Sequence, residues 1–351
     1  MTVLVLILVL GLAAANGSND VSKGVATLAG AGVARLRTAV VWGAVTTAVG
    51  CLVSLHFAAK LTALFSKGIV SAKPTPAFAA AVLIGTAAWV GLATWRRLPV
   101  STTHALVGSL LGAGTVFAAS SVKWAALVVK VVEPLLLSVL IAWAVSTILS
   151  IGGKFVSNRV RVSKATKAPE GEKVLVTAGA AAQTGAEPEP AVRPEPAERL
   201  GVIGAAHWLT AGMTSFARGL NDTPKIVAIG SFALLSGLTP TGLLFLVTAA
   251  MFIGAIVVGQ LVAARLANDV IKMSHAEGFT ANLTTAVMVA LGAFHGWPMS
   301  TTHVSTGAIT GTAGLNLSRI KGKTVRDFVI AWVVTPPVAG AVAVIVFLIL
   351  R

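Results

Sequence analysis

Long apolar runs separated by short polar or basic stretches are the main feature of the chain. Several runs, such as 125–151 and 328–350, are nearly free of charge and long enough to cross a bilayer as one helix. Helices are expected because hydrocarbon cannot satisfy an open backbone, and because the alternating pattern of a barrel strand is absent. The pattern therefore predicts an all-α, multi-pass membrane protein embedded in the lipid bilayer of the cell membrane.

The expected segments fall into two halves with the same order. Each half has a long segment interrupted by polar residues, a second segment, two shorter runs around a proline, and a final long segment. The segments cover about 2–34, 38–59, 77–95, 104–119 and 124–152 in the first half, and about 200–237, 239–264, 279–295, 304–317 and 327–350 in the second. We expect the first segments to be broken at 16–20 and 218–224, and Glu133-Pro134 to kink its segment.

Residues 154–199, between the halves, differ in composition from the rest of the chain. They hold five of the 14 prolines and six of the 12 acidic residues, with few large apolar side chains. This composition is typical of a solvated, disordered linker. The predicted organisation is therefore a first membrane repeat at 1–153, a cytoplasmic linker at 154–199, and a second, inverted membrane repeat at 200–351.

Two short sequence frames occur once in each half. Gly-x-Asn-Asp-x-x-Lys stands at 17–23 and at 219–225, and Pro-x-Ser-Thr-Thr-His stands at 99–104 and at 298–303. Their offsets, 202 and 199 residues, are nearly equal. Two frames repeated at almost one offset indicate a tandem duplication.

The two short apolar runs of each half allow two topologies. They form either a re-entrant hairpin with Ser-Thr-Thr at its tip, or two full crossings. Each half then crosses the membrane three or five times, which is odd in both cases, so the second half is inverted relative to the first. We favour the hairpin, because Pro99 and Pro298 break a helix and the hydroxyls that follow can begin a new one.

The net charge of +15 is explained by membrane orientation. With hairpins, and with residue 1 outside, sixteen basic residues lie inside, five outside and six at membrane depth. This excess follows the positive-inside rule and indicates a cytoplasmic linker. No soluble domain is available to carry a basic surface, so we expect no nucleic-acid partner.

The repeated frames supply two kinds of binding chemistry. A half-helix that starts at each hairpin tip presents free N–H groups and a partial positive charge, and two such ends near the midplane form an anion site. Asp20 and Asp222 are costly inside a membrane and, with unwound carbonyls beside them, can bind a hard cation such as Na⁺. Alternatively, each aspartate only pairs with its neighbouring Lys23 or Lys225. An anion site beside a cation site suggests cation-coupled anion transport.

With these paired frames in both halves, the chain resembles the inorganic phosphate transporter (PiT) family everywhere except in the linker. The resemblance implies inverted repeats with two re-entrant hairpins, assembled as a homodimer. It implies a secondary active transporter that imports inorganic phosphate by alternating access. It implies coupling to Na⁺ or H⁺, of which we expect Na⁺. We expect no cofactor, and we expect the protein not to be an enzyme.

Carried over by position, the hydroxyls of the two tips and two asparagines bind phosphate: Ser101, Thr102, Thr103, Ser300, Thr301, Thr302, Asn19 and Asn221. Asp20 and Asp222, with the same asparagines, bind Na⁺. The chain departs from the family at Lys23 and Lys225, where asparagine is frequent. An ammonium there can replace a bound cation or contact the anion. We expect the second, because hydroxyls and helix ends leave much of the charge of phosphate unmatched.

Weaker expectations concern residues next to these frames. His104 and His303 are accessory candidates, either as proton carriers or as packing residues under the tips. The glycines at 108, 112, 307 and 311 are expected to permit close helix contact.

Four alternative functions remain open: a permease for sulfate or another oxyanion, a passive anion channel, an intramembrane hydrolase, and a sensor. Two equal Ser-Thr-Thr-His copies disfavour a hydrolase, whose nucleophile is normally single. The buried aspartates disfavour a channel. The polar linker disfavours a sensor, because it is unsuited to form a folded domain.

Overall fold

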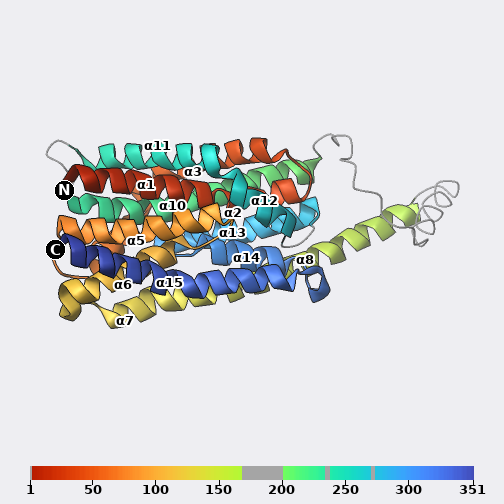
Figure 1. The fold of residues 1–351 in the computed structure, drawn as a ribbon. Coiled ribbons are helices and arrows are strands. Elements are labelled where there is room, and N and C mark those ends of the chain that lie inside the picture. Colours follow the sequence, from red (N-terminus) through yellow and green to blue (C-terminus); the bar gives the residue numbers. More distant parts are fainter. Residues whose placement is uncertain (1, 168–200, 234–237, 270–272) are drawn as a thin grey trace.

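The computed structural model describes residues 2–167, 201–233, 238–269 and 273–351, and this part of the chain is helical apart from turns and one isolated β-bridge. Seven of its helices are long and apolar enough to cross a bilayer, from Val3–Gly30 to Gly322–Leu350. The prediction of an all-α, multi-pass membrane protein is thus confirmed. Figure 1 shows the helices packed side by side in one bundle.

The first half contains α1 to α8. Their bounds are α1 Thr2–Asp20, α2 Ser22–Gly30, α3 Leu36–Phe57, α4 Ala59–Ala63, η1 Leu64–Gly68, α5 Pro76–Trp95, α6 Thr102–Ala118, η2 Ala119–Ser121, α7 Trp124–Leu127, η3 Val128–Val132 and α8 Glu133–Lys167.

The second half contains α10 to α15. Their bounds are α10 Val202–Gly230, η4 Ser231–Ala233, α11 Pro240–Val258, α12 Gln260–Asp269, α13 His275–His295, α14 Thr301–Gly311, η5 Leu317–Arg319 and α15 Gly322–Leu350.

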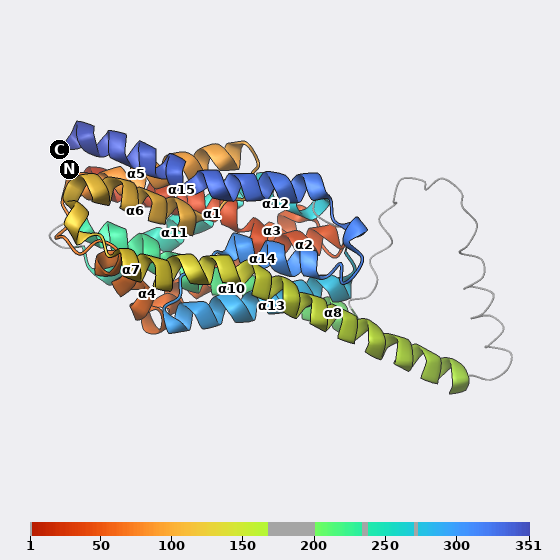
Figure 2. The same ribbon diagram turned by 90° about the horizontal axis from the view of Figure 1, so that it is seen from below.

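The α5–α6 and α13–α14 pairs approach each other from opposite directions. Figures 1 and 2 show α5–α6 at the end that carries both chain termini, and α13–α14 towards the other end. The two turns meet inside the bundle, where Val100 and Met299 are buried and Thr302 Oγ1 donates to the Val100 carbonyl at 2.7 Å. Full crossings would carry each turn to a membrane surface, so this arrangement favours hairpins.

The helices that carry the Asn-Asp frames differ from the prediction. α10 runs without a break through 218–224, with Pro224 inside it, and α1 continues to Asp20, so the interruption falls only at Val21. Gly17 and Gly219 do not unwind these helices. A Cβ at either position would overlap a backbone carbonyl of a neighbouring helix. The expected breaks at 16–20 and 218–224 are therefore wrong, because these glycines serve close helix packing.

The last helix of the first half is irregular and longer than expected. A π-helical turn, Val128–Val132, precedes Glu133-Pro134, which is where a kink was predicted. α8 then continues to Lys167, so residues 154–167 of the predicted linker are helical, and Figure 1 shows this end projecting from the bundle. Residues 154–167 contain no proline, which is compatible with a helix. Residues 168–199 of the predicted linker lie outside the described residues.

Paired glycines hold each hairpin against the other half. A Cβ at Gly108 or Gly112 of α6 would overlap backbone atoms of α15, and one at Gly307 or Gly311 of α14 would overlap those of α8. The predicted role of these glycines in close helix contact is confirmed. Each hairpin thus packs against the final helix of the opposite half.

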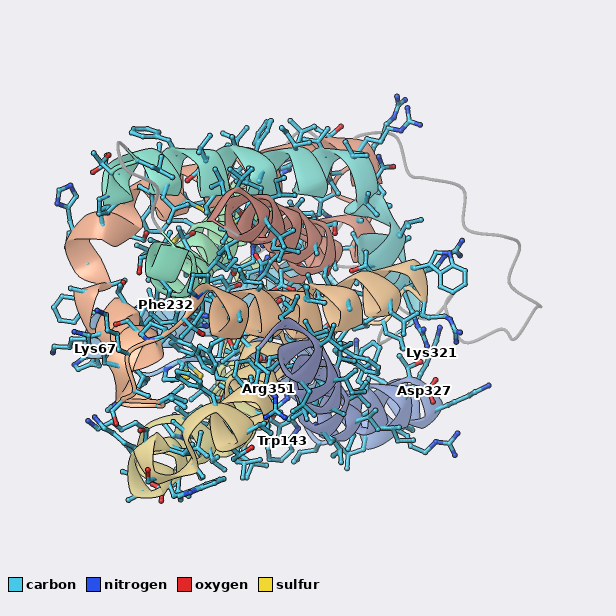
Figure 3. All side chains as sticks on the ribbon, turned by 60° about the vertical axis from the view of Figure 1, so that its left-hand side comes forward. Lys67, Trp143, Phe232, Lys321, Asp327 and Arg351 are labelled. Atoms are coloured by element: carbon cyan, nitrogen blue, oxygen red, sulfur yellow. The ribbon has the colours of Figure 1, made fainter. Side chains whose placement is uncertain are left out.

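The predicted topology places Lys67 outside the membrane and Lys321 inside, and Figure 3 labels both residues, which lie on opposite sides of that view. Which end of the bundle faces the cytoplasm stays a prediction.

Candidate functional site

The repeated frames come together at the centre of the bundle. α1, α2 and α10 carry the two Asn-Asp-x-x-Lys frames, and the first turns of α6 and α14 carry the hydroxyls of the hairpin tips. Except for His104, every predicted site residue is at most 5 % exposed. The site is therefore closed to both membrane surfaces in this structure.

Asn19 fastens the first hairpin tip. Its Nδ2 amide donates to Thr94 Oγ1 at 3.0 Å and to the Leu98 carbonyl at 2.9 Å, while its Oδ1 accepts the Val100 N–H at 3.2 Å. Both ends of the amide are thus engaged by the hairpin. A role of Asn19 as a ligand of phosphate or Na⁺ stays a prediction, and it would require some of these bonds to open.

Asn221 forms hydrogen bonds through only one end of its side-chain amide. Its Nδ2 donates to the Met299 carbonyl at 2.8 Å and to Asp222 Oδ1 at 3.0 Å. Its Oδ1 is buried and has no hydrogen-bond partner among the described residues. Buried amide oxygens normally have a partner, so this atom is available to a ligand.

Lys23 pairs with the carboxylate of its own frame. Its Nζ forms an ion pair with Asp20 Oδ1, donates to the Val100 carbonyl at 3.0 Å, and lies 3.3 Å from Asn19 Oδ1. The ammonium is therefore surrounded by three oxygen atoms, as a bound metal cation would be.

Lys225 makes the equivalent contacts in the second half. Its Nζ lies 3.1 Å from Asp222 Oδ1, 2.7 Å from Thr103 Oγ1 and 3.3 Å from the Met299 carbonyl. Both lysines therefore pair with the aspartates of their own frames, which is the alternative named above, and a contact of either lysine with phosphate stays a prediction. On a continuous helix a spacing of three residues places the two side chains together, and a buried carboxylate needs a partner.

The serines of the two tips cap their helices. Ser101 Oγ accepts the N–H of His104 at 3.2 Å, and Ser300 Oγ accepts that of His303 at 3.2 Å. Because each serine accepts in this bond, its own O–H proton remains available to donate to an anion. The caps confirm the predicted helix starts, and the binding of phosphate by these hydroxyls stays a prediction.

Threonines connect the two tips across the site. Thr302 bonds to the Val100 carbonyl as described above, and Thr103 Oγ1 lies 3.4 Å from the Met299 carbonyl. Thr102 accepts a bond from Asn16, and Thr301, its equivalent, is buried in the first turn of α14. The six predicted hydroxyls therefore all lie at the junction of the two tips.

The two histidines lie against each other beneath the tips. The rings of His104 and His303 are 4.6 Å apart between centroids, and His303 is 4.1 Å from Trp332. His303 Nδ1 lies 3.2 Å from the Leu135 carbonyl. These contacts support the packing alternative for both histidines.

Asn16 and Arg218 belong to the site but were not predicted as ligands. Asn16 Nδ2 lies 3.0 Å from Thr102 Oγ1 and 3.3 and 3.2 Å from the Oδ2 atoms of Asp20 and Asp222. Arg218 donates to Asn16 Oδ1 at 3.3 Å and is 1 % exposed. The sequence could have indicated both residues. The 202-residue offset makes positions 16 and 218 equivalent, and an arginine within an apolar segment is costly and therefore a candidate functional residue.

A pocket of about 380 Å³ lies beside α10. It is lined by α3, α4, η1 and α11, with Pro224 and Val227 contributed by α10. None of the predicted site residues lines it. The pocket reaches the helix that carries Asp222, but it does not open the site.

The comparisons with known proteins agree on one family. A profile described as "Phosphate transporter family" matches residues 16–343. The chain is 27 % identical to a protein of Mycobacterium bovis, over 93 % of this chain and 72 % of that one, and 26 % identical to a protein of Bacillus subtilis, over 100 % and 97 %. Both are named "Probable low-affinity inorganic phosphate transporter".

One solved structure has the same fold. It is described as "The sodium-dependent phosphate transporter" and superposes with a TM-score of 0.77, at 24 % identity, over 99 % of this chain and 98 % of that one. The chain belongs to the phosphate transporter family and is a membrane transporter rather than an enzyme.

Proposed function

We propose that this protein imports inorganic phosphate by secondary active transport, coupled to a cation, with alternating access to the central site. Phosphate transport as such follows from the family. The observation that carries the proposal is the junction of the two hairpin tips, where six buried hydroxyls and two helix N-termini lie beside a cluster of cationic side chains. Hydroxyls, helix N-termini and cationic side chains are suited to hold a tetrahedral oxyanion.

Alternating access is supported by burial of the site. A substrate cannot reach residues that are closed to both surfaces unless one end of the bundle opens at a time. We propose that the two halves are inverted repeats and that their hairpins open in turn. The support is that α5–α6 and α13–α14 reach the centre from opposite directions.

The coupling cation is Na⁺ or H⁺. The family resemblance of the sequence favours Na⁺ at Asp20 and Asp222. The ion pairs with Lys23 and Lys225 favour H⁺, because Na⁺ can reach these carboxylates only if the ammonium groups leave them. Both alternatives keep the same phosphate site at the hairpin tips.

The assembly and orientation are proposals that rest on the sequence. We propose a homodimer with the linker 154–199 in the cytoplasm. Single cysteines in a Cys51→Ser background test the orientation with an impermeant reagent. Labelling of linker cysteines in sealed, right-side-out cells would contradict it.

Uptake of radiolabelled phosphate into proteoliposomes tests the function. Na⁺ and pH gradients are imposed separately, so that each candidate cation is examined alone. We expect accumulation above equilibrium with one gradient and only equilibration without any. Uptake that never exceeds equilibrium would indicate a channel, and full competition by equimolar sulfate would indicate a broader oxyanion permease.

A further inference from the structure

The buried charges at the centre of the bundle do not cancel. Five ionisable side chains that are always or normally charged lie there: Asp20, Lys23, Arg218, Asp222 and Lys225. Each aspartate forms an ion pair with the lysine of its own frame. Such a pair has zero net charge wherever its proton lies, so the two pairs contribute nothing to the total.

Arg218 is the remaining charge. Its guanidinium stays protonated in proteins. Its terminal nitrogens bond to two neutral groups, Asn16 Oδ1 at 3.3 Å and Thr47 Oγ1 at 2.8 Å. Its Nε is buried without a hydrogen-bond partner, and it forms no ion pair within the part of the chain that the structure describes.

A buried cation in this condition is costly. Removing one charge from water carries a penalty that is offset only by a counter-charge and a complete set of hydrogen bonds. In the closed site no carboxylate forms an ion pair with Arg218 among the described residues, and its set of hydrogen bonds is incomplete. The missing counter-charge is one negative unit, and the unpaired Nε provides one donor toward it.

The position of Arg218 places this charge next to the predicted phosphate ligands. Asn16, the equivalent residue of the first half, touches Arg218 with its Oδ1 and Thr102 of the hairpin tip with its Nδ2. A single amide side chain therefore separates the guanidinium from the tip. Planar guanidinium groups are also the preferred partners of phosphate oxygens.

We propose that Arg218 is the charge partner of the transported phosphate and that the site takes the monoanion, dihydrogen phosphate, without an added metal cation. This inference rests on the proposed function and deepens it. One negative charge balances Arg218, while Lys23 and Lys225 occupy the positions where coupling cations would otherwise neutralise the aspartates. The monoanion forms in solution when hydrogen phosphate takes up one proton on oxygen, so that proton crosses the membrane with the substrate.

The first test measures uptake by the unmodified protein in proteoliposomes. Na⁺ is replaced by choline, and the half-saturating phosphate concentration is measured across the pH range in which monoanion and dianion interconvert. We expect a constant value when it is expressed as monoanion, and a rising value with rising pH when it is expressed as total phosphate. A value that is constant as dianion, or an absolute requirement for Na⁺, would overturn the proposal. Absence of phosphate uptake under every condition would instead refute the proposed function.

The second test separates Arg218 from other groups that titrate near it. The ionisable groups that interact with the guanidinium are Asp20, Lys23, Asp222 and the Cys51 thiol. Arg218→Gln removes the charge, and Arg218→Lys keeps it without the planar fork. We expect KM for phosphate to rise by about a hundredfold in Arg218→Gln and about tenfold in Arg218→Lys, with the monoanion preference lost only in the first.

Arg265→Gln is the matched control, because Arg265 lies on α12 and pairs with Asp327 at 3.4 Å, away from the site. Its KM is expected to equal that of the parent. If Arg218→Gln folds and keeps the parental KM and pH dependence, Arg218 is a structural residue and the proposal fails. If it does not fold, Arg218→Lys and the pH dependence of the parent decide.

Discussion

The lysines of the two halves make matching contacts, but one central position differs in charge between the halves. Lys23 and Lys225 contact the aspartates of their own frames and the carbonyls of Val100 and Met299 at the hairpin tips. Asn16 and Arg218, however, are equivalent in sequence and unlike in charge. A neutral amide in one half and a cation in the other leave a single net positive charge, which two identical halves could not give because their charges would double.

This difference shows how duplicated halves can divide their tasks. The repeated aspartates and lysines form two ion pairs that together carry no net charge. The residue that breaks the repeat supplies the net charge, and under the proposal above this charge sets the sign of the ligand. Substitutions at equivalent positions of the two halves test which residues act alike in both halves and which do not.

Loss of one aspartate is expected to have the largest effect. Asp20→Asn or Asp222→Asn leaves a buried ammonium without its counter-charge, which costs on the order of 3–5 kcal/mol. We expect both variants to abolish phosphate uptake and to unfold at lower temperature in detergent.

The matched control removes both charges of a pair. Asp20→Asn with Lys23→Asn restores neutrality, so it is expected to recover most of the lost stability. If Na⁺ instead stabilises and stimulates this double variant alone, the asparagine pair has created a cation site that the lysine normally fills. A double variant less stable than Asp20→Asn would contradict the neutral-pair description.

The hairpin serines are expected to have equal effects in the two halves. Ser101→Ala and Ser300→Ala each remove a helix cap and a donor for phosphate. The lost hydroxyl is worth on the order of 1–3 kcal/mol, or roughly a tenfold to hundredfold weaker affinity. Binding is measured on purified protein with inorganic phosphate.

Ser101→Thr and Ser300→Thr serve as controls, because they keep the hydroxyl. Parental phosphate affinity in both alanine variants would show that the serines only cap the helices.

The glycine contacts test the packing between halves. Gly108→Ala and Gly307→Ala place a methyl group against backbone atoms of α15 and α8, and we expect each to destabilise the protein by about 1–3 kcal/mol. Gly91→Ala is the matched control, since an added Cβ there meets open space. Gly91 lies within α5, where alanine favours the helix more than glycine does. Thermal unfolding should therefore shift downward for the first two and not for the control.

The smallest effect is expected where the hairpins begin. Glu277 opens α13 in a capping box with Ser274 and lies 2.7 Å from Arg319. Burial raises the pKa of this carboxyl, but the bonds from Arg319 and the Ser274 backbone outweigh it and lower the pKa to about 2. A pKa below the ordinary value means that Glu277 stabilises the fold above about pH 4.5 and that this contribution is lost as the pH falls toward 2.

Glu277→Gln should therefore cost on the order of 1 kcal/mol at neutral pH, and its difference from the parent should shrink on acidification. The first hairpin offers the comparison, because Thr75 Oγ1 accepts the Phe78 N–H at 3.2 Å as a neutral cap of α5. Thr75→Ala should cost about 1 kcal/mol with no such pH dependence. Melting curves at several pH values distinguish the two.

Several local expectations failed for a common reason. The first segment of each half was expected to break at 16–20 and at 218–224, stretches that contain Gly17, Gly219 and Pro224. Glycine and proline do disfavour a helix locally, but this preference breaks the helix only if the backbone is free to leave the helical conformation. In the bundle, neighbouring helices fill the space beside Gly17 and Gly219 and keep the backbone helical.

The sequence alone determined the helical membrane class, the two halves, the hairpin tips and the residues that gather at the centre. It could do so because apolar run length, proline, capping hydroxyls and repeated frames act locally or by simple repetition. Only the tertiary structure decided which partner each lysine takes, that Asn16 and Arg218 join the site, and that one buried charge remains unpaired. The last two of these facts depend on distances between side chains about two hundred residues apart, and the contacts that set such distances exist only once the helices have packed.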